Sequence, residues 1–172
     1  MDSRQIVQLS VLTALAISIY TVENLLPNPV PWMRLGLSNA VVLLGIVGFG
    51  IRGGVLISLL RTILGSFILG TFLSPSFFFA LSGGLSSAVL MGVLYRFLRR
   101  ALSLVGISIC GALAHNGAQL ALASSLFIGR PEVMLLLPLF GFASLVAGTL
   151  TGFIVHFLSL STKFAKLEPR RS

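Results

Sequence analysis

The sequence predicts an all-α integral membrane protein, built as one bundle of six transmembrane helices. Of its 172 residues, 56% are hydrophobic and only 9% are charged, whereas a soluble domain has about 25% charged residues. The mean hydropathy is +1.03. Twelve basic and four acidic residues cannot keep the surface of a soluble domain of this length hydrated. The composition therefore excludes a soluble globular protein and a disordered chain, and six continuous apolar runs indicate membrane-spanning helices.

Each apolar run is predicted to form one span. All but the second approach or exceed the roughly 20 residues that cross a bilayer. The second must thin the bilayer locally or be shielded by other helices. The last contains Pro138, which we expect to kink it. The predicted spans are residues 6–26, 36–51, 53–73, 76–95, 103–128 and 133–160.

The basic residues predict the orientation of the chain. If the N-terminus is cytoplasmic, nine of them lie on the cytoplasmic side, and only Arg34 and Arg130 lie outside. Because cytoplasmic loops carry the excess of Lys and Arg, we expect a multi-pass protein of the cell inner (plasma) membrane. Residues 1–172 form a single domain with both termini cytoplasmic, and 161–172 form a basic tail. The nine are Arg4, Arg52, Arg96, Arg99, Arg100, Lys163, Lys166, Arg170 and Arg171.

Several site classes are excluded by the residues themselves. The net charge of +8 serves orientation and contact with the lipid bilayer rather than nucleic acid, since no basic and aromatic surface accompanies it. The single cysteine, Cys110, excludes an intrachain disulfide and a zinc site. Residues 48–53 match G-x-G-x-x-G, but they lack the strand and helix context of dinucleotide binding. These glycines instead predict a tight turn and close helix contact.

No catalytic constellation is present. The only acidic residues are Asp2, Glu23, Glu132 and Glu168, which supply no Asp-rich pair for magnesium and diphosphate. There is also no nucleophile and base at a characteristic spacing, and no Walker loop. We therefore expect no enzyme activity, no catalytic residue, no cofactor and no metal.

Arg61 is the most informative residue. It lies about eight residues, or roughly 12 Å, from the inner end of its predicted span. An unpaired arginine at such a depth costs at least about 2.5–3.5 kcal/mol on insertion scales. Three interpretations follow: a structural ion pair, a helix or partner contact near the inner face, or a site for a substrate anion.

Further polar residues are predicted near the outer ends of the first two spans. Glu23 could pair with Arg34 across the proline-spaced segment 25–32, or join Asn24 and Asn39 around a polar pocket. The proline-spaced segment cannot be helical, and it is either a stiff connector or a lid over that pocket.

Two more groups stand out within the spans. His115, Asn116 and Gln119 place three polar side chains within five positions of the fifth span, which favours a lined cavity because such groups rarely face lipid. Ser10, Ala14 and Ser18 recur every four residues and form a flat stripe for close helix contact. The stripe serves either packing within the bundle or docking to a partner membrane protein.

Five short segments, in this order, resemble a known family. They are Pro31–Asn39, Gly50–Gly54, Leu60-Arg61-Thr62, Ser82-Gly83-Gly84 and Ala114–Gln119. The chain resembles the family labelled heptaprenyl diphosphate synthase component I, also called the Gx transporter family. More distantly, it resembles the substrate-binding S components of energy-coupling factor (ECF) importers. The resemblance covers nearly the whole chain up to about Leu160.

The resemblance implies an S-component-like fold and a membrane-embedded protein that binds a small hydrophobic or anionic compound, either vitamin-like or isoprenoid-related. Its partners would be a transmembrane scaffold and a pair of ATPases. Small residues of the first span contact the scaffold in S components, which implies docking through Ser10, Ala14 and Ser18, although two serines depart from the usual Ala-x-x-x-Ala. The synthase label implies a link to isoprenoid or quinone metabolism, not an activity.

Three hypotheses follow from residues and resemblance together. In the first, the chain is a substrate-capture subunit of an importer. In the second, it is an accessory subunit of heptaprenyl diphosphate synthesis, and its basic inner face recruits a soluble prenyl transferase. In the third, it is a gradient-driven carrier. The first hypothesis predicts a substrate-binding site that contains Glu23, Asn24, Arg34, Asn39, Arg61, His115, Asn116 and Gln119.

Overall fold

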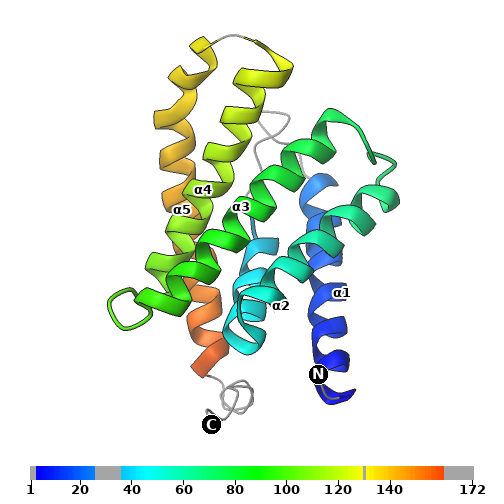
Figure 1. The fold of residues 1–172 in the computed structure, drawn as a ribbon, viewed down its shortest axis with the longest axis vertical. Coiled ribbons are helices and arrows are strands. Elements are labelled where there is room, and N and C mark those ends of the chain that lie inside the picture. The colour runs from blue at the N-terminus through cyan, green and yellow to red at the C-terminus, as the bar shows by residue number, and fades with distance from the viewer. Residues whose placement is uncertain (1–2, 26–35, 130, 161–172) are drawn as a thin grey trace.

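The computed structural model describes residues 3–25, 36–129 and 131–160. These residues form helices joined by short connections, with no strand among them (Figure 1). The five α-helices are α1 (Ser3–Leu25), α2 (Ser38–Ile68), α3 (Pro75–Leu98), α4 (Leu104–Leu122) and α5 (Leu137–Leu160). A π-helical turn, η1 (Ala123–Phe127), extends α4, and a 3-10 helix, η2 (Pro131–Leu136), precedes α5.

Five helical segments are long and apolar enough to cross a membrane, which confirms an all-α, multi-pass membrane protein. The structure has five such helices rather than six separate ones, because the predicted spans 36–51 and 53–73 both fall largely within α2. This helix has 31 residues and is broken at Gly50, whose φ of 71° and ψ of −172° are not helical. A positive φ favours glycine, which has no Cβ, so the predicted turn among these glycines is confirmed.

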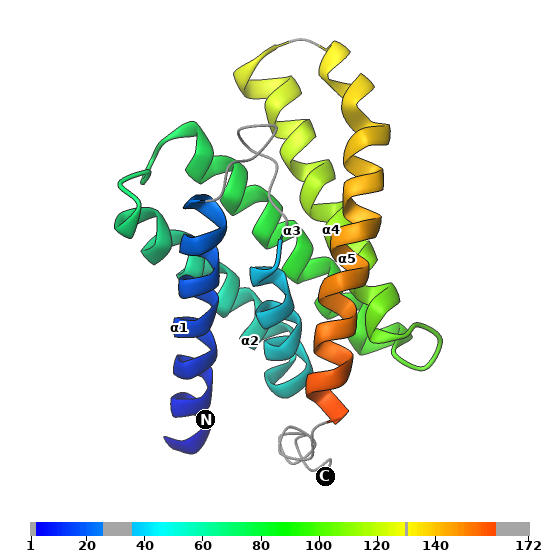
Figure 2. The ribbon, with the colours of Figure 1, turned by 180° about the vertical axis from the view of Figure 1, so that it is seen from behind.

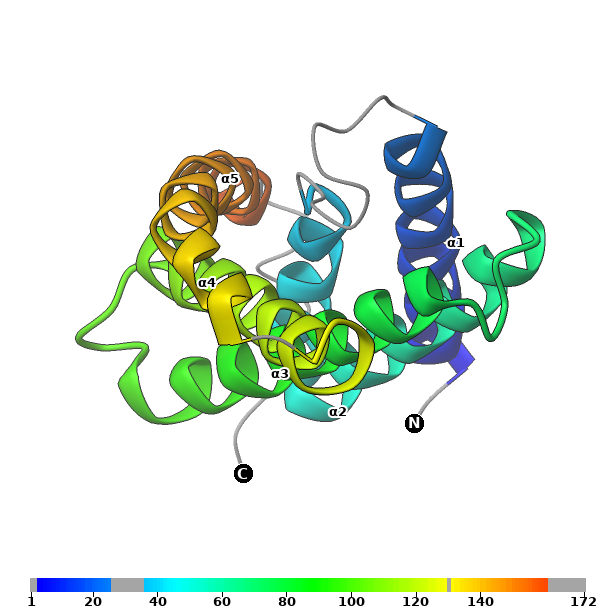
Figure 3. The same cartoon turned by 90° about the horizontal axis from the view of Figure 1, so that it is seen from above.

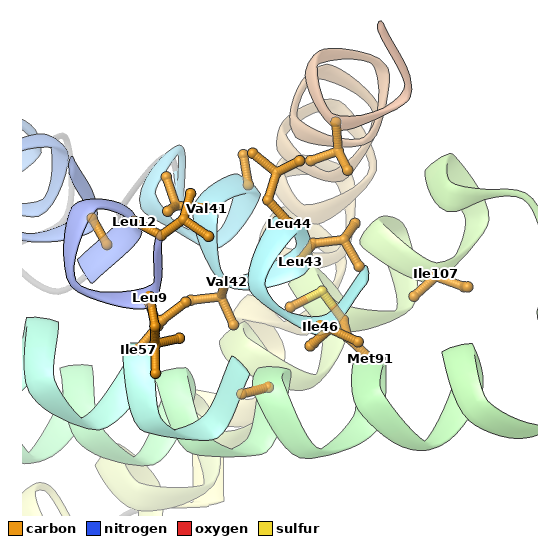
Figure 4. Packing of buried hydrophobic residues seen from close by; sticks show 14 residues of the cluster. Leu9, Leu12, Val41, Val42, Leu43, Leu44, Ile46, Ile57, Met91 and Ile107 are labelled. Atoms are coloured by element: carbon orange, nitrogen blue, oxygen red, sulfur yellow. The ribbon is translucent and has the colours of Figure 1, made fainter. Parts of the chain in front are cut away.

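The two halves of α2 fold back on each other at Gly50. A Cβ added to Gly54 would collide with the side chain of Ile46, and one added to Gly45 would collide with Ile57. Residues 45 and 57 would lie about 18 Å apart along a straight helix, so this proximity requires the chain to reverse. Ile46 and Ile57 are fully buried in the hydrophobic cluster that surrounds the first half of α2 (Figure 4).

The first half of α2 is the centre of the bundle. It lies between α1 on one side and α4 with α5 on the other, while α3 and the second half of α2 cover a third side (Figure 3). Residues 40–44 are all buried. In contrast, large apolar side chains are exposed on the outer faces, for example Val11 on α1 and Phe142 on α5. An apolar exterior is what a hydrocarbon environment requires.

The ends of the bundle differ in charge. The start of α1, the bend at Gly50, the connection after α3 and the end of α5 all lie at one end of the molecule (Figures 1 and 2). We call this the basic end, because the segments there carry Arg4, Arg52, Arg96, Arg99 and Arg100. The two acidic residues in the described part of the chain belong to segments at the opposite end, the last turn of α1 and the 3-10 helix η2.

The predicted kink at Pro138 is wrong. Pro138 is the second residue of α5, which begins at Leu137 and continues to Leu160. A proline is tolerated in the first turn of a helix because its missing N–H would have no partner within the helix. The predicted last span, 133–160, therefore divides into part of η2 and the whole of α5.

Close contact between α4 and α5 depends on glycine. A Cβ on Gly148 would lie 2.6 Å from the Cα of Ile109, which is backbone and cannot turn aside. We expect Gly148→Ala to lower the free energy of unfolding by about 1–3 kcal/mol, the usual cost of overpacking. Gly141→Ala is the matched control on the same helix, because its Cβ would meet nothing within 4 Å. Thermal unfolding in detergent measures both, and equal unfolding temperatures for the two variants would contradict this account of the contact.

Candidate functional site

Polar side chains from all five α-helices are buried in the interior of the bundle. Two small cavities lie among them, and Gly36, Asn39 and His115 line both. Each cavity has a volume of about 10 Å³, which is about enough for one water molecule. The buried polar residues include Glu23, Ser38, Asn39, Arg61, Thr62, His115, Asn116, Gln119 and Ser144.

Glu23 joins the end of α1 to the start of α2. Its Oε1 accepts a hydrogen bond from the backbone N–H of Leu37 at 2.6 Å, and its Oε2 accepts one from the N–H of Ser38 at 3.1 Å. The first N–H groups of a helix lack partners within the helix and carry a partial positive charge, so a carboxylate stabilises them. Arg34, the partner considered from the sequence, lies outside the described residues, as does the proline-spaced segment 25–32 except for Leu25, which is the last residue of α1 and is helical.

Arg61 connects the two halves of α2. Only 2% of the residue is exposed, and its Nη2 donates a hydrogen bond to Asn39 Oδ1 at 2.5 Å. It lines the same cavity as Glu23 and His115. The structure thus brings four of the predicted site residues together at this point.

The side chain of Asn24 bonds within its own helix and not with the other site residues. Its Nδ2 donates to the carbonyl oxygen of Tyr20 at 2.7 Å, one turn back in α1, and it lines neither cavity. Tyr20 does line one of them, and the sequence offered no signal for it beyond its position three residues before Glu23.

His115 and Gln119 form a pair on one face of α4. The Nε2 of Gln119 donates to the carbonyl oxygen of Phe79 at 3.3 Å and lies 3.1 Å from Nε2 of His115. Because a carbonyl oxygen only accepts hydrogen bonds, the amino group of Gln119 must face Phe79. Its Oε1 therefore points elsewhere, and it has no hydrogen-bond partner among the described residues.

Asn116 is oriented in the same way by α5. Its Nδ2 donates to Ser144 Oγ at 2.8 Å and faces the carbonyl oxygen of Phe140 at 3.4 Å. Its Oδ1 is buried and has no hydrogen-bond partner in the part of the chain that the structure describes. The described residues thus leave two buried acceptors of the site without a hydrogen-bond partner, Asn116 Oδ1 and Gln119 Oε1.

Two glycines of α3 make room for this arrangement. A Cβ on Gly83 would lie 2.9 Å from Cε1 and Nε2 of the His115 ring. A Cβ on Gly84 would lie 2.8 Å from Ser58 Oγ and 3.4 Å from Nη2 of Arg61. Gly83 and Gly84 carry part of the family resemblance, but the sequence alone predicted no structural role for them.

One known protein family covers the part of the chain that contains this site. A family described as heptaprenyl diphosphate synthase component I matches residues 12–158. The chain belongs to this family. The matched region contains every site residue described above, from Tyr20 to Ser144. No curated protein and no solved structure matches the chain.

The small-residue stripe of α1 lies outside the candidate site. Ser10, Ala14 and Ser18 are all exposed on α1, so the rest of the bundle does not cover this stripe. Among the described residues of the chain, no three His, Cys, Asp or Glu side chains are grouped so that they could hold a metal ion.

Proposed function

We propose that this chain is the substrate-binding component of an ECF-type importer and captures a small compound from the outer face of the membrane. One observation carries the proposal: a buried arginine and a set of buried amides and hydroxyls meet inside a bundle with an apolar exterior. Ionisable residues inside a membrane protein are costly and usually mark a path or site for a polar molecule. A structural role alone would not require two acceptors that the described residues leave unused.

The side chains indicate the chemistry of the ligand. Arg61 favours a negative group, and the free oxygens of Asn116 and Gln119 favour an N–H or O–H donor, since a buried acceptor without a partner is unfavourable. A vitamin-like compound with an acidic group and polar hydrogens fits both requirements. Because each cavity holds only about one water, the outer ends of the helices must separate to admit such a compound.

The exposed stripe on α1 supports docking to a scaffold. Ser10, Ala14 and Ser18 let another helix approach closely, and the large apolar residues Val11 and Leu15 beside them are exposed as well. The bend at Gly50 divides α2 in two, and the described helices run alternately between the two ends of the bundle (Figure 1), which supports a chain that crosses the membrane six times. Six passes would leave both termini on the cytoplasmic side, where a pair of ATPases would act.

A second function is favoured by the family and by the basic end. The name of the family implies another synthase component as a partner, and clustered arginines attract an acidic soluble protein. On this alternative, the chain anchors a prenyl transferase at the membrane. Pull-down from native membranes separates the two functions: recovery of a membrane scaffold with two ATPases supports the importer, and recovery of a prenyl transferase alone supports the anchor.

Substitutions in the site test ligand capture. We expect His115→Ala and Asn116→Leu each to lower the amount of co-purified compound about tenfold, since one hydrogen bond to the ligand is lost. Native mass spectrometry of protein purified from its own membranes measures this occupancy. Asn116→Leu should still fold, because Ser144 keeps its bonds to the carbonyl oxygens of Phe140 and Ala112.

Thr149→Val is the matched control. Thr149 is half-buried on α5 and lines neither of the two small cavities, and among the described residues its hydroxyl bonds to the carbonyl oxygen of Leu145 in its own helix. Its occupancy should equal that of the unmodified protein. Unchanged occupancy in both site variants would remove the proposed site.

A further inference from the structure

We propose that an anionic phospholipid binds in a groove on the outside of α2, next to the bend. The groove shares no lining residue with the two small cavities of the candidate site, and it has a volume of about 380 Å³. We call it the α2 groove, and it is lined by Ile51, Arg52, Val55, Leu56 and Leu59.

The spacing of these residues shows that the groove runs along α2. Ile51, Val55 and Leu59 are spaced four apart, so they follow one face of the helix, and Leu56 continues the row of Arg52. From Ile51 to Leu59 the groove is about 12 Å long, a substantial part of one leaflet of a roughly 30 Å hydrocarbon core. Arg52 stands at the end next to Gly50, where the basic end of the bundle begins. An acyl chain would therefore lie along the apolar row with its headgroup at Arg52.

The positive charge of Arg52 favours a lipid with an anionic headgroup. Arg52 is exposed, and it has no hydrogen bond or ion pair with any described residue. The charged side chains at this end are all basic over residues 3–25, 36–129 and 131–160, since Glu23 and Glu132 belong to segments at the other end. Among the described residues, no carboxylate at the basic end competes with a lipid headgroup for Arg52. A lipid with a net negative charge supplies the missing counter-charge, and a zwitterionic lipid does not.

The test is native mass spectrometry of the full chain in detergent, titrated with phosphatidylglycerol or with phosphatidylcholine of the same acyl chains. We expect one phosphatidylglycerol to bind in preference to phosphatidylcholine. Arg52→Gln should lower the apparent affinity for phosphatidylglycerol about fivefold, the effect of one basic residue at an anionic lipid. Val55→Phe should lower binding of the same lipid by filling the groove while leaving the charge in place.

Arg96→Gln is the matched control. It removes the same charge at the same end, but Arg96 lies on α3 and stacks over the ring of Phe97 at 5.7 Å. Its affinity for phosphatidylglycerol should stay within twofold of the unmodified value. Equal losses in Arg52→Gln and Arg96→Gln, or equal binding of the two lipids, would overturn the site. A dimer that disappears in Val55→Phe would also overturn it, because a second copy would then occupy the groove.

Discussion

Replacing Glu23 with alanine is expected to lower the free energy of unfolding by at least about 2 kcal/mol. The substitution removes both acceptors from the N–H groups of Leu37 and Ser38, and bonds to a charged acceptor contribute about 1.5–3 kcal/mol. Only 4% of Glu23 is exposed, so water cannot readily replace its oxygens. Thermal unfolding followed by circular dichroism measures the loss, and hydrogen exchange at Leu37 and Ser38 localises it.

Asn24→Ala is the neighbouring control for this prediction. Asn24 bonds only within α1, to Tyr20, so its removal should cost less than about 1 kcal/mol. Glu23→Gln should fall between the two, because the amide keeps one acceptor and turns a donor toward the second N–H. If Glu23→Ala unfolds at the same temperature as Asn24→Ala, the carboxylate does not hold α1 to α2.

Arg61→Met is expected to separate stability from ligand capture. Loss of the hydrogen bond to Asn39 and of the other interactions of Arg61 destabilises the fold by about 1.5–3 kcal/mol, but removal of a charge from the hydrocarbon region recovers about 2.5–3.5 kcal/mol. The two effects nearly cancel, so the unfolding temperature without ligand should change little. Occupancy by the co-purified compound should fall at least thirtyfold, corresponding to about 2 kcal/mol or more for a buried charge pair.

Thr62→Val is the control beside it, since Thr62 lines neither of the two small cavities and, among the described residues, its hydroxyl bonds to the carbonyl oxygen of Ser58 one turn back. Both its stability and its ligand occupancy should stay close to those of the unmodified protein. A large drop in the unfolding temperature of Arg61→Met, with ligand occupancy unchanged, would make Arg61 a structural residue and contradict its role in capture.

Much of the fold could be predicted from hydrophobicity alone, because lipid-facing and core-facing residues are both apolar in a membrane bundle. The bounds of α1, α3 and α4 with η1 follow the apolar runs to within a few residues. The bend at Gly50 was also predictable, because glycine and Arg52 interrupt one long run. The role of Pro138 was not, since hydropathy does not distinguish a 3-10 turn from the first turn of an α-helix.

The site was harder to predict, because contacts between helices depend on rotation about each axis. Glu23 and Asn24 are adjacent and both polar, yet successive side chains on a helix differ by about 100°, so only Glu23 enters the bundle. His115 and Gln119 share a face by their spacing, and the structure places them together. The contact of Gly83 with the His115 ring depends on how α3 crosses α4. The order of residues along one sequence does not reveal that crossing.

The hairpin within α2 has a consequence for how the protein is made. Its first half, residues 38–49, is about 18 Å long and falls short of the roughly 30 Å hydrocarbon layer. On leaving the ribosome this segment cannot settle across the bilayer by itself. We therefore expect it to enter the bilayer together with the helix beyond Gly50, as one helical pair.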